Sequence, residues 1–190
     1  MGAVPPRLAR ARRLDEGRVR RIADALRGRT DLAQATVYFS HNVFEAYAQC
    51  NLGDCLQDRL DTWRQFAALG FKTTPEMPEP SRSDCHVWGA HPLYHFFASL
   101  LGVRPGLGFR TVIVTPQCGT LTAMAGRLPT PHGPIEFELR LVDDHLRGRI
   151  SLPPGMTGTL RWAGEDRRWQ GLLTVDHECG GGATRGSRVH

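Results

Sequence analysis

Apolar positions at helical spacing dominate the first hundred residues. They recur every three or four residues within residues 15–29, 36–50 and 54–69, which predicts three helices. Asn51 and Gly53 are expected to stop the second helix, and Asp54 to cap the third. The last two helices, joined by a short turn, predict an antiparallel hairpin. The apolar positions are Val19, Ile22, Ala23, Leu26, Val37, Phe39, Val43, Phe44, Tyr47, Leu56, Leu60, Trp63 and Ala67.

A fourth helical pattern runs from about residue 83 to residue 102. Ser83 or Asp84 is a candidate N-cap, and Gly102 is expected to end the helix. Pro92 either kinks this helix or marks its true start, because proline lacks the backbone donor of a helix interior. The apolar positions of this helix are Leu93, Phe96, Phe97, Leu100 and Leu101.

Beyond Gly102 the pattern changes from helical to alternating. Short segments rich in β-branched residues are separated by glycine, proline or aspartate, which predicts a small antiparallel β domain over residues 104–175. Residues 176–190 have too little apolar content to pack, so we expect a disordered tail. The predicted fold class is α+β, with a helical domain over residues 1–103. The predicted strand segments are 109–116, 121–130, 135–142, 146–153 and 158–164.

Composition and charge limit the classes of function that we expect for this chain. The chain has 190 residues, of which 41% are hydrophobic, as in a globular protein. Its net charge of +5 is concentrated in residues 1–30, which hold nine arginines and three acidic residues, and no groove-reading motif accompanies them. We therefore expect no nucleic-acid partner. No apolar run is long enough for a membrane span or a secretory signal, and the five cysteines lack paired spacing, so we expect a cytoplasmic protein.

The stretch "TTPEMPEPSRSDCHVWGAHPLY", residues 73–94, concentrates side chains that could do chemistry. His86, His91 and His95 were weighed as metal ligands, since the last two have i, i+4 spacing. Pro92 interrupts their helix and no glutamate lies between them, so we expect no metal site. Cys85 is a poor nucleophile candidate, because on a helix its neighbour His86 would point about 100° away.

Carboxylate chemistry is the remaining option for this stretch. Glu76 and Glu79 lie in a proline-punctuated loop that can hold a side chain at the mouth of a helical scaffold. A carboxylate there could activate water, and Trp88 could offer an apolar platform to a sugar ring. The alternative from composition alone is a solvated acidic loop.

The order of these residues resembles a known enzyme family. "LGFKTTPEMPEPSRSDCHVWGAHPLYHFFASLLGVRPGLGFRTVIVTP" is similar to the end of the helical barrel in bacterial α-L-rhamnosidases and related six-hairpin glycosidases. The later "GRLPTPHGPIEFEL" and "ISLPPGMTGTLRW" resemble the C-terminal β-sandwich of that family, so the resemblance covers roughly residues 31–163. It implies terminal hairpins of an (α/α)6 barrel followed by the β-sandwich, and a rhamnose-containing glycoside as substrate.

The resemblance also implies roles for individual residues. Glu76 matches the family's catalytic base, which polarises water for attack with inversion at the anomeric carbon, and His86 matches its sugar-contacting histidine. It assigns no catalytic role to Glu79, Asp84 or Trp88, but on chemical grounds we expect Trp88 to contact substrate. In this chain the threonine pair directly precedes "PE", where relatives often place an aromatic residue.

One element of the family's chemistry is missing. An inverting glycosidase needs a second carboxyl group as general acid, which in the family comes from an acidic motif earlier in the barrel. No segment before Thr36 contains that motif. We therefore expect a C-terminal fragment that needs no cofactor, is inactive alone, and has the missing N-terminal part of the barrel as a possible partner. The alternative is a non-catalytic carbohydrate-binding or interaction module built on the β domain.

Overall fold

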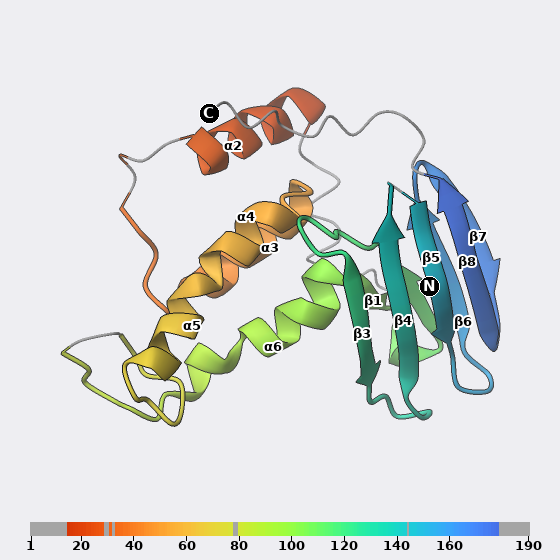
Figure 1. Cartoon of the computed structure of the whole chain (residues 1–190). Coiled ribbons are helices and arrows are strands. Elements are labelled where there is room, and N and C mark those ends of the chain that lie inside the picture. The colour runs from red at the N-terminus through yellow and green to blue at the C-terminus, as the bar shows by residue number, and fades with distance from the viewer. Residues whose placement is uncertain (1–14, 29–30, 32, 78–79, 144, 179–190) are drawn as a thin grey trace. The chain divides into compact units, whose positions relative to one another are not determined.

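A computed structural model describes residues 15–28, 31, 33–77, 80–143 and 145–178. The chain divides between Leu100 and Leu101 into two compact units. Helices make up the first unit and two β-sheets make up the second (Figure 1). This arrangement confirms the predicted α+β class. Among the described residues, no helix combines the length and the apolar character that crossing a membrane requires.

The first helix, α2 (Glu16–Gly28), lies where the sequence predicted it. Its apolar stripe is only half-buried, and none of its residues is fully buried. An ion pair instead links it to helix α4 (Gly53–Arg59): the Arg27 guanidinium donates two hydrogen bonds, of 2.7 and 3.1 Å, to the Asp54 carboxylate.

The predicted helix over residues 54–69 is two helices, α4 and α5 (Asp61–Ala68). Leu60 ends one and begins the other, and it is buried together with Leu56. The prediction of Asp54 as N-cap was wrong: Leu52 precedes α4, and Asp54 lies in its first turn. Helix α3 (Ser40–Gln49) precedes this pair and ends before Asn51, whose φ of 57° turns the chain.

The fourth predicted helix has three parts. Val87–Ala90 forms a 3₁₀ turn, η1, which is followed by helix α6 (Pro92–His95) and a π-helical turn, η2 (Phe96–Leu100). Pro92 occupies the first position of α6, so it marks the true start, as one of the two alternatives predicted. Ser83 and Asp84 lie in the preceding loop and cap no helix, because the helical segment begins only at Val87.

The second unit contains two four-stranded sheets, one behind the other in Figure 1. One sheet has the strand order β1-β2-β6-β7 and the other β3-β4-β5-β8. A short 3₁₀ turn, η3 (Leu107–Phe109), lies between β1 and β2. The strands are β1 (Val103–Pro105), β2 (Thr111–Val114), β3 (Ala123–Leu128), β4 (Ile135–Val142), β5 (His145–Ser151), β6 (Thr157–Trp162), β7 (Glu165–Trp169) and β8 (Leu172–Glu178).

Alternation along the strands builds the core of this unit. In β4, Ile135, Phe137 and Leu139 are buried while the residues between them are exposed, as a half-buried strand requires. The expectation of a purely antiparallel sandwich was wrong at one pair: β2 and β6 are parallel. They can pair in this way because the chain crosses through β3, β4 and β5 between them.

Strands β1, β7 and β8 were not predicted. Strand β8 pairs with β5 through Glu178, so residues 176–178, which we expected to begin a disordered tail, are part of a sheet. The pairing with β5 explains this outcome. The backbone of β8 gains hydrogen bonds from β5 whatever the apolar content of its side chains. Residues 179–190 of the predicted tail lie outside the described residues.

Candidate functional site

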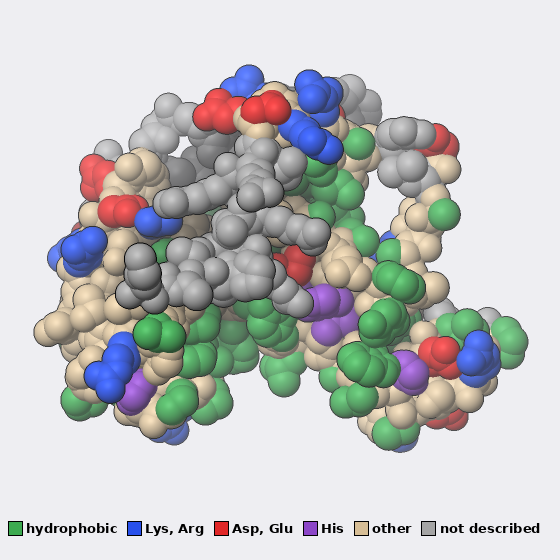
Figure 2. All heavy atoms as spheres, turned by 180° about the vertical axis from the view of Figure 1, so that it is seen from behind, with side chains coloured by type: hydrophobic (Ala, Val, Ile, Leu, Met, Phe, Trp, Pro, Cys, Tyr) green, Lys and Arg blue, Asp and Glu red, His purple; other side chains and the backbone are tan. Residues whose placement is uncertain are grey.

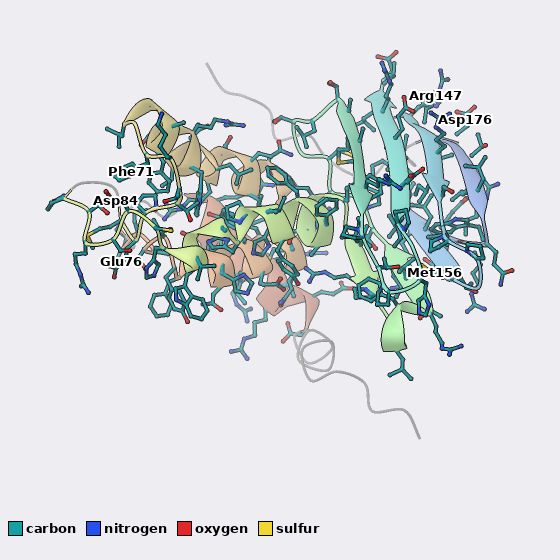
Figure 3. The ribbon with its side chains drawn as sticks, turned by 90° about the horizontal axis from the view of Figure 1, so that it is seen from below. Phe71, Glu76, Asp84, Arg147, Met156 and Asp176 are labelled. Carbon is teal, nitrogen blue, oxygen red and sulfur yellow. The ribbon has the colours of Figure 1, made fainter. Side chains whose placement is uncertain are left out.

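The proline-rich loop folds back on itself at its base. The amide of Glu76 donates to the carbonyl of Ser83 at 2.9 Å, and the amide of His86 donates to the carbonyl of Thr74 at 2.7 Å. The Thr74 hydroxyl returns a hydrogen bond to the His86 carbonyl at 2.9 Å. These bonds fix the backbones of Glu76 and His86 side by side. Figure 3 shows Glu76 and Asp84 on this loop.

Gly89 holds the loop base close to the 3₁₀ turn η1. A Cβ atom on this buried glycine would lie 2.9 Å from Cβ of Thr74, closer than side chains approach in proteins. The carbonyl of Gly89 also accepts a hydrogen bond of 2.6 Å from the Trp63 indole. The residue after Trp88 must therefore be very small for the loop and the turn to meet.

A pocket of about 380 Å³ lies in the helical unit. It brings together the three site residues that the sequence predicted, Glu76, His86 and Trp88. The residues that line it are Thr36, Tyr38, Phe39, Glu76, Met77, His86 and Trp88. Asp84 and Cys85 are exposed on the loop and do not line this pocket, and Glu79 lies outside the described residues.

The carboxylate of Glu76 is partly exposed in this pocket. Its side chain keeps 27% of its surface accessible, so solvent water reaches it. Arg82 extends from the other side of the loop and lies 3.5 Å from one carboxylate oxygen, through its Nε. Because Arg82 is 75% exposed, this ion pair is well screened and leaves the carboxylate able to contact a ligand.

Three aromatic rings form the rim of the pocket. Trp88 is 58% exposed, and its ring meets that of Tyr38 edge to face, with centroids 5.4 Å apart. The ring of Phe39 packs against Tyr38 in the same manner at 5.1 Å and is 57% exposed. Exposed aromatic groups gathered beside polar ones are typical of ligand-binding surfaces.

Two of these rings were missed by sequence reasoning. Phe39 was assigned to the apolar face of a helix, and Tyr38 was not singled out. Both lie just before α3 begins at Ser40, so they do not share its buried face. The available signal was the run Val37-Tyr38-Phe39: three consecutive large residues cannot all face one core, and of these only Val37 is buried.

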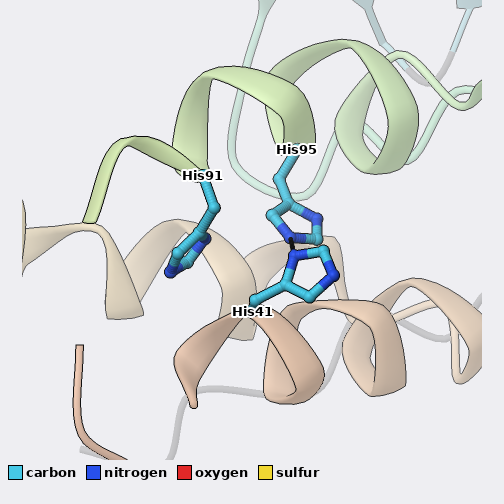
Figure 4. A group of neighbouring side chains, drawn as sticks. All are labelled: His41, His91 and His95. Carbon is cyan, nitrogen blue, oxygen red and sulfur yellow. Dashed lines mark hydrogen bonds between the residues drawn. The ribbon is translucent and has the colours of Figure 1, made fainter. Parts of the chain in front are cut away.

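The histidines weighed as metal ligands do not all come together. His86 lines the pocket, whereas His91 and His95 lie beside His41 of helix α3 (Figure 4). The candidate nitrogen atoms of His41, His91 and His95 are all within 4.8 Å of one another. His41 was missed because its proximity to the other two is a contact between distant parts of the sequence.

Comparison with known proteins finds a family model that matches part of the sheet unit. Residues 102–171 match the family model described as bacterial alpha-L-rhamnosidase C-terminal domain. No curated protein sequence matches the chain significantly.

Solved structures extend the similarity to the helical unit. The GH78 family rhamnosidase of Bacillus sp. GL1 is 26% identical, with 77% of this chain covered and a TM-score of 0.62. The α-L-rhamnosidase of Aspergillus terreus is 15% identical, with 86% covered and a TM-score of 0.71. The enzyme from Dictyoglomus thermophilum is 17% identical, with 78% covered and a TM-score of 0.64.

The chain accounts for a small part of each of these proteins. It spans 18%, 22% and 19% of their respective lengths. The match of residues 102–171 to a C-terminal domain indicates which part that is. The chain is therefore related to the C-terminal region of the GH78 α-L-rhamnosidases, and resembles the C-terminal part of such an enzyme.

Proposed function

We propose that the chain carries the general-base side of an inverting α-L-rhamnosidase site. The observation that supports this is the shared pocket of Glu76, His86 and Trp88, in a chain related to this enzyme family. In the proposed mechanism the Glu76 carboxylate accepts a proton from a water molecule as that water attacks the anomeric carbon. The accessible position of Glu76 leaves room for this water.

The rest of the pocket would hold the sugar. Rhamnose is a deoxy sugar, with a methyl group where most hexoses have a hydroxymethyl group, so it presents both hydroxyls and an apolar surface. The imidazole of His86 would hydrogen-bond the hydroxyls, and Trp88 would cover the apolar surface together with Tyr38 and Phe39. A rhamnose-containing glycoside is the proposed ligand. The related enzyme of Streptomyces avermitilis has been solved in complex with L-rhamnose.

The proposed site needs a second carboxyl group. Inversion requires a general acid at roughly 6.5–9.5 Å from the base. Among the described residues that line the pocket, Glu76 is the only acidic one. We propose that helices α3 to α6 are the end of an (α/α)6 barrel whose other hairpins supply the acid. On this proposal the chain alone binds the sugar but does not hydrolyse the glycoside.

Sugar binding is the direct test of this proposal. We expect L-rhamnose to quench or shift tryptophan fluorescence in the parent chain, and Trp88→Ala and His86→Ala to weaken binding at least tenfold. His132→Ala, in the sheet unit, is the matched control and should bind as the parent does. Equal rhamnose binding by Trp88→Ala, His86→Ala and the parent would rule out this pocket as the sugar site.

Hydrolysis is measured separately, on an activated aryl α-L-rhamnoside and on a natural glycoside. We expect no turnover of either by the chain alone, since general acid–base assistance contributes about 10²–10⁴-fold in rate. Turnover that disappears in Glu76→Gln would contradict the proposed lack of a general acid, while supporting Glu76 as the base.

A second candidate function rests on the sheet unit. A groove of about 570 Å³ lies along β3, β4 and β5, with Arg127, Arg140 and Arg149 beside Glu136 and Glu138. Alternating guanidinium and carboxylate groups can hydrogen-bond the hydroxyls of an extended glycan, which favours a non-catalytic carbohydrate-binding module. Arg140→Ala should then abolish binding of a rhamnose-containing polysaccharide in pull-down assays while Trp88→Ala leaves it intact. The reverse result would favour the helical pocket.

A further inference from the structure

The three histidines of Figure 4 come from two segments of the helical unit. His41 is on α3, and His91 and His95 are at the two ends of the turn that contains Pro92. Their ring centroids are 5.0 to 5.7 Å apart, and one nitrogen of each lies within 4.8 Å of the others. None of the three lines the pocket of Glu76.

The hydrogen bond of His91 determines which of its two ring nitrogens carries no proton. Its Nε2 lies 3.0 Å from the backbone carbonyl of Val37. A carbonyl can only accept, so Nε2 carries the proton and Nδ1 keeps a lone pair. This Nδ1 is buried and has no hydrogen-bond partner among the residues that the structure describes. A buried unpaired nitrogen costs stability unless something binds to it.

His95 is held in a similar way. It is completely buried, and its Nδ1 lies 2.8 Å from the Ser99 hydroxyl. When Nδ1 donates to that hydroxyl, Nε2 has the lone pair, and this Nε2 lies 3.0 Å from Nδ1 of His41. A metal-binding histidine is usually oriented by a hydrogen bond that its other ring nitrogen donates, here to the Ser99 hydroxyl from His95 and to the Val37 carbonyl from His91.

His91 is partly buried in an aromatic environment. Burial lowers the pKa of His91, and the nearby His41 lowers it further, against the opposing effect of the Val37 carbonyl. The rings of Phe44 and Trp63 pack against His91 at centroid distances of 5.2 and 5.1 Å. A metal binds histidine through a nitrogen that carries no proton, and the hydrogen bond from Nε2 to the Val37 carbonyl leaves Nδ1 of His91 in that state.

We propose that His41, His91 and His95 form a binding site for a divalent transition metal ion, with Zn²⁺ as the best fit. The ligand nitrogens would be Nδ1 of His41, Nδ1 of His91 and Nε2 of His95. Three imidazoles without a carboxylate suit zinc rather than calcium or magnesium, which prefer oxygen. Tetrahedral zinc with bonds of about 2.0–2.1 Å needs ligand nitrogens roughly 3.3 Å apart, so modest ring rotation completes the site.

Binding would replace one hydrogen bond with metal ligation. His41 would change tautomer: its proton would move from Nδ1 to Nε2, so that the lone pairs of His41 Nδ1 and His95 Nε2 both face the metal. A water molecule would fill the fourth position. The ion would tie α3 to the segment that follows Pro92. This inference departs from the sequence-based expectation of no metal site, because that expectation lacked His41.

The test is a zinc titration of the full chain. Thiols are first alkylated, since Cys50, Cys55, Cys85 and Cys118 form no disulfide among the described residues and could bind zinc themselves. Zn²⁺ is then titrated into the metal-free protein in competition with a chromophoric chelator. We expect one equivalent to bind, and His41→Ala and His91→Ala each to weaken binding at least 100-fold. His132→Ala and His86→Ala are the matched controls and should leave affinity unchanged.

Two further measurements keep the test decisive. His91→Phe preserves the ring that packs on Trp63 while removing the nitrogens, so it serves if His91→Ala fails to fold. Co²⁺ in place of zinc should give the intense visible bands of a tetrahedral ion in the parent only. Stoichiometric zinc binding that persists unchanged in the folded His91 variant, or no zinc binding by the parent, would overturn the proposal and leave a metal-free cluster of packed histidines.

Discussion

At the residue scale, Phe44 and His86 of the helical unit differ sharply in their burial. Phe44 is fully buried among the rings of Tyr47, Trp63 and the histidines, whereas His86 is half-buried at the rim of the pocket. Complete burial is typical of a core side chain such as Phe44. Partial exposure in a pocket beside a carboxylate is typical of a ligand-binding side chain, as expected for His86. Stability measurements separate the two roles.

We predict that His86→Ala changes the free energy of unfolding by no more than about 0.5 kcal/mol, because the side chain is not part of the core. Phe44→Ala, the comparison variant, should cost about 3–5 kcal/mol through the cavity it leaves. Urea denaturation of both variants checks this. A large loss of stability in His86→Ala would indicate a structural role for this histidine in place of ligand contact.

At the same scale, sequence reasoning found part of the site. Glu76, His86 and Trp88 lie within one short stretch, so local motifs could identify them. Tyr38 and His41 reach their partners only when α3 packs beside the segment after residue 86, and a contact of that range leaves no local signal.

The contact between the loop and turn η1 matters at the scale of elements. Gly89→Ala should destabilise the chain by about 1–3 kcal/mol, because the new methyl group meets the stiff, β-branched Thr74. It should also weaken rhamnose binding, since Thr74 fixes the backbone of His86. Gly28→Ala is the control: no described residue lies within 4 Å of a Cβ there, so its stability should stay within about 0.5 kcal/mol of the parent. Equal behaviour of the two variants would contradict the tight contact.

The ion pair between α2 and α4 predicts a pH effect. Burial alone would raise the pKa of Asp54, but the hydrogen bonds and charge of Arg27 outweigh it and hold that pKa below its ordinary value. A carboxyl group whose folded pKa is lowered stabilises the fold above its unfolded pKa, and this stabilisation is lost as pH falls through the folded pKa.

Arg27→Gln should therefore cost stability at about pH 6 and cost little at about pH 2, well below the unfolded aspartate pKa of about 3.9. Because both side chains are more than a third exposed, we expect at most about 0.5 kcal/mol. Arg20→Gln, on the same helix, is the control, and thermal melts over this pH range are the measurement. A loss of stability that is constant with pH would show that the ion pair is not its cause.

Elements were predictable to the extent that their sequence pattern was local. Strand β4 shows the expected alternation, and α2 the expected spacing. The break at Leu60 was missed because its apolar side chain continues the helical pattern even though the helix ends there. Strand β7 was missed because its residues are mostly acidic or basic and show no apolar alternation. It forms at the sheet edge because its partner β6 supplies the hydrogen bonds.

At the scale of the whole molecule, the helical unit exposes many large apolar side chains, as Figure 2 shows for one face of the molecule. Val87, next to Trp88 in the sequence, is 78% exposed, and Leu93 is 65% exposed. Patches of this kind usually mark association surfaces. A unit that is the end of a larger helical barrel would present such a surface.

We predict that the isolated chain self-associates through this surface. The double change Val87→Ser and Leu93→Gln should lower the apparent mass toward that of a monomer of 21.1 kDa in static light scattering. Leu107→Gln, an equally exposed change in the sheet unit, should leave the mass distribution as it was. A parent chain that is already monomeric would show that the helical unit needs no covering partner.

The parallel pairing of β2 with β6 has a consequence for how the protein is made. Thr111 pairs with Thr157, so during synthesis β2 waits for β3, β4 and β5 to leave the ribosome before its partner exists. Until then one edge of β2, with its Val-Ile-Val sequence, is open to pairing with another nascent chain. Slow translation of the three intervening strands would therefore lengthen the time for which this edge is open, and a chaperone that covers it would lower the risk of aggregation.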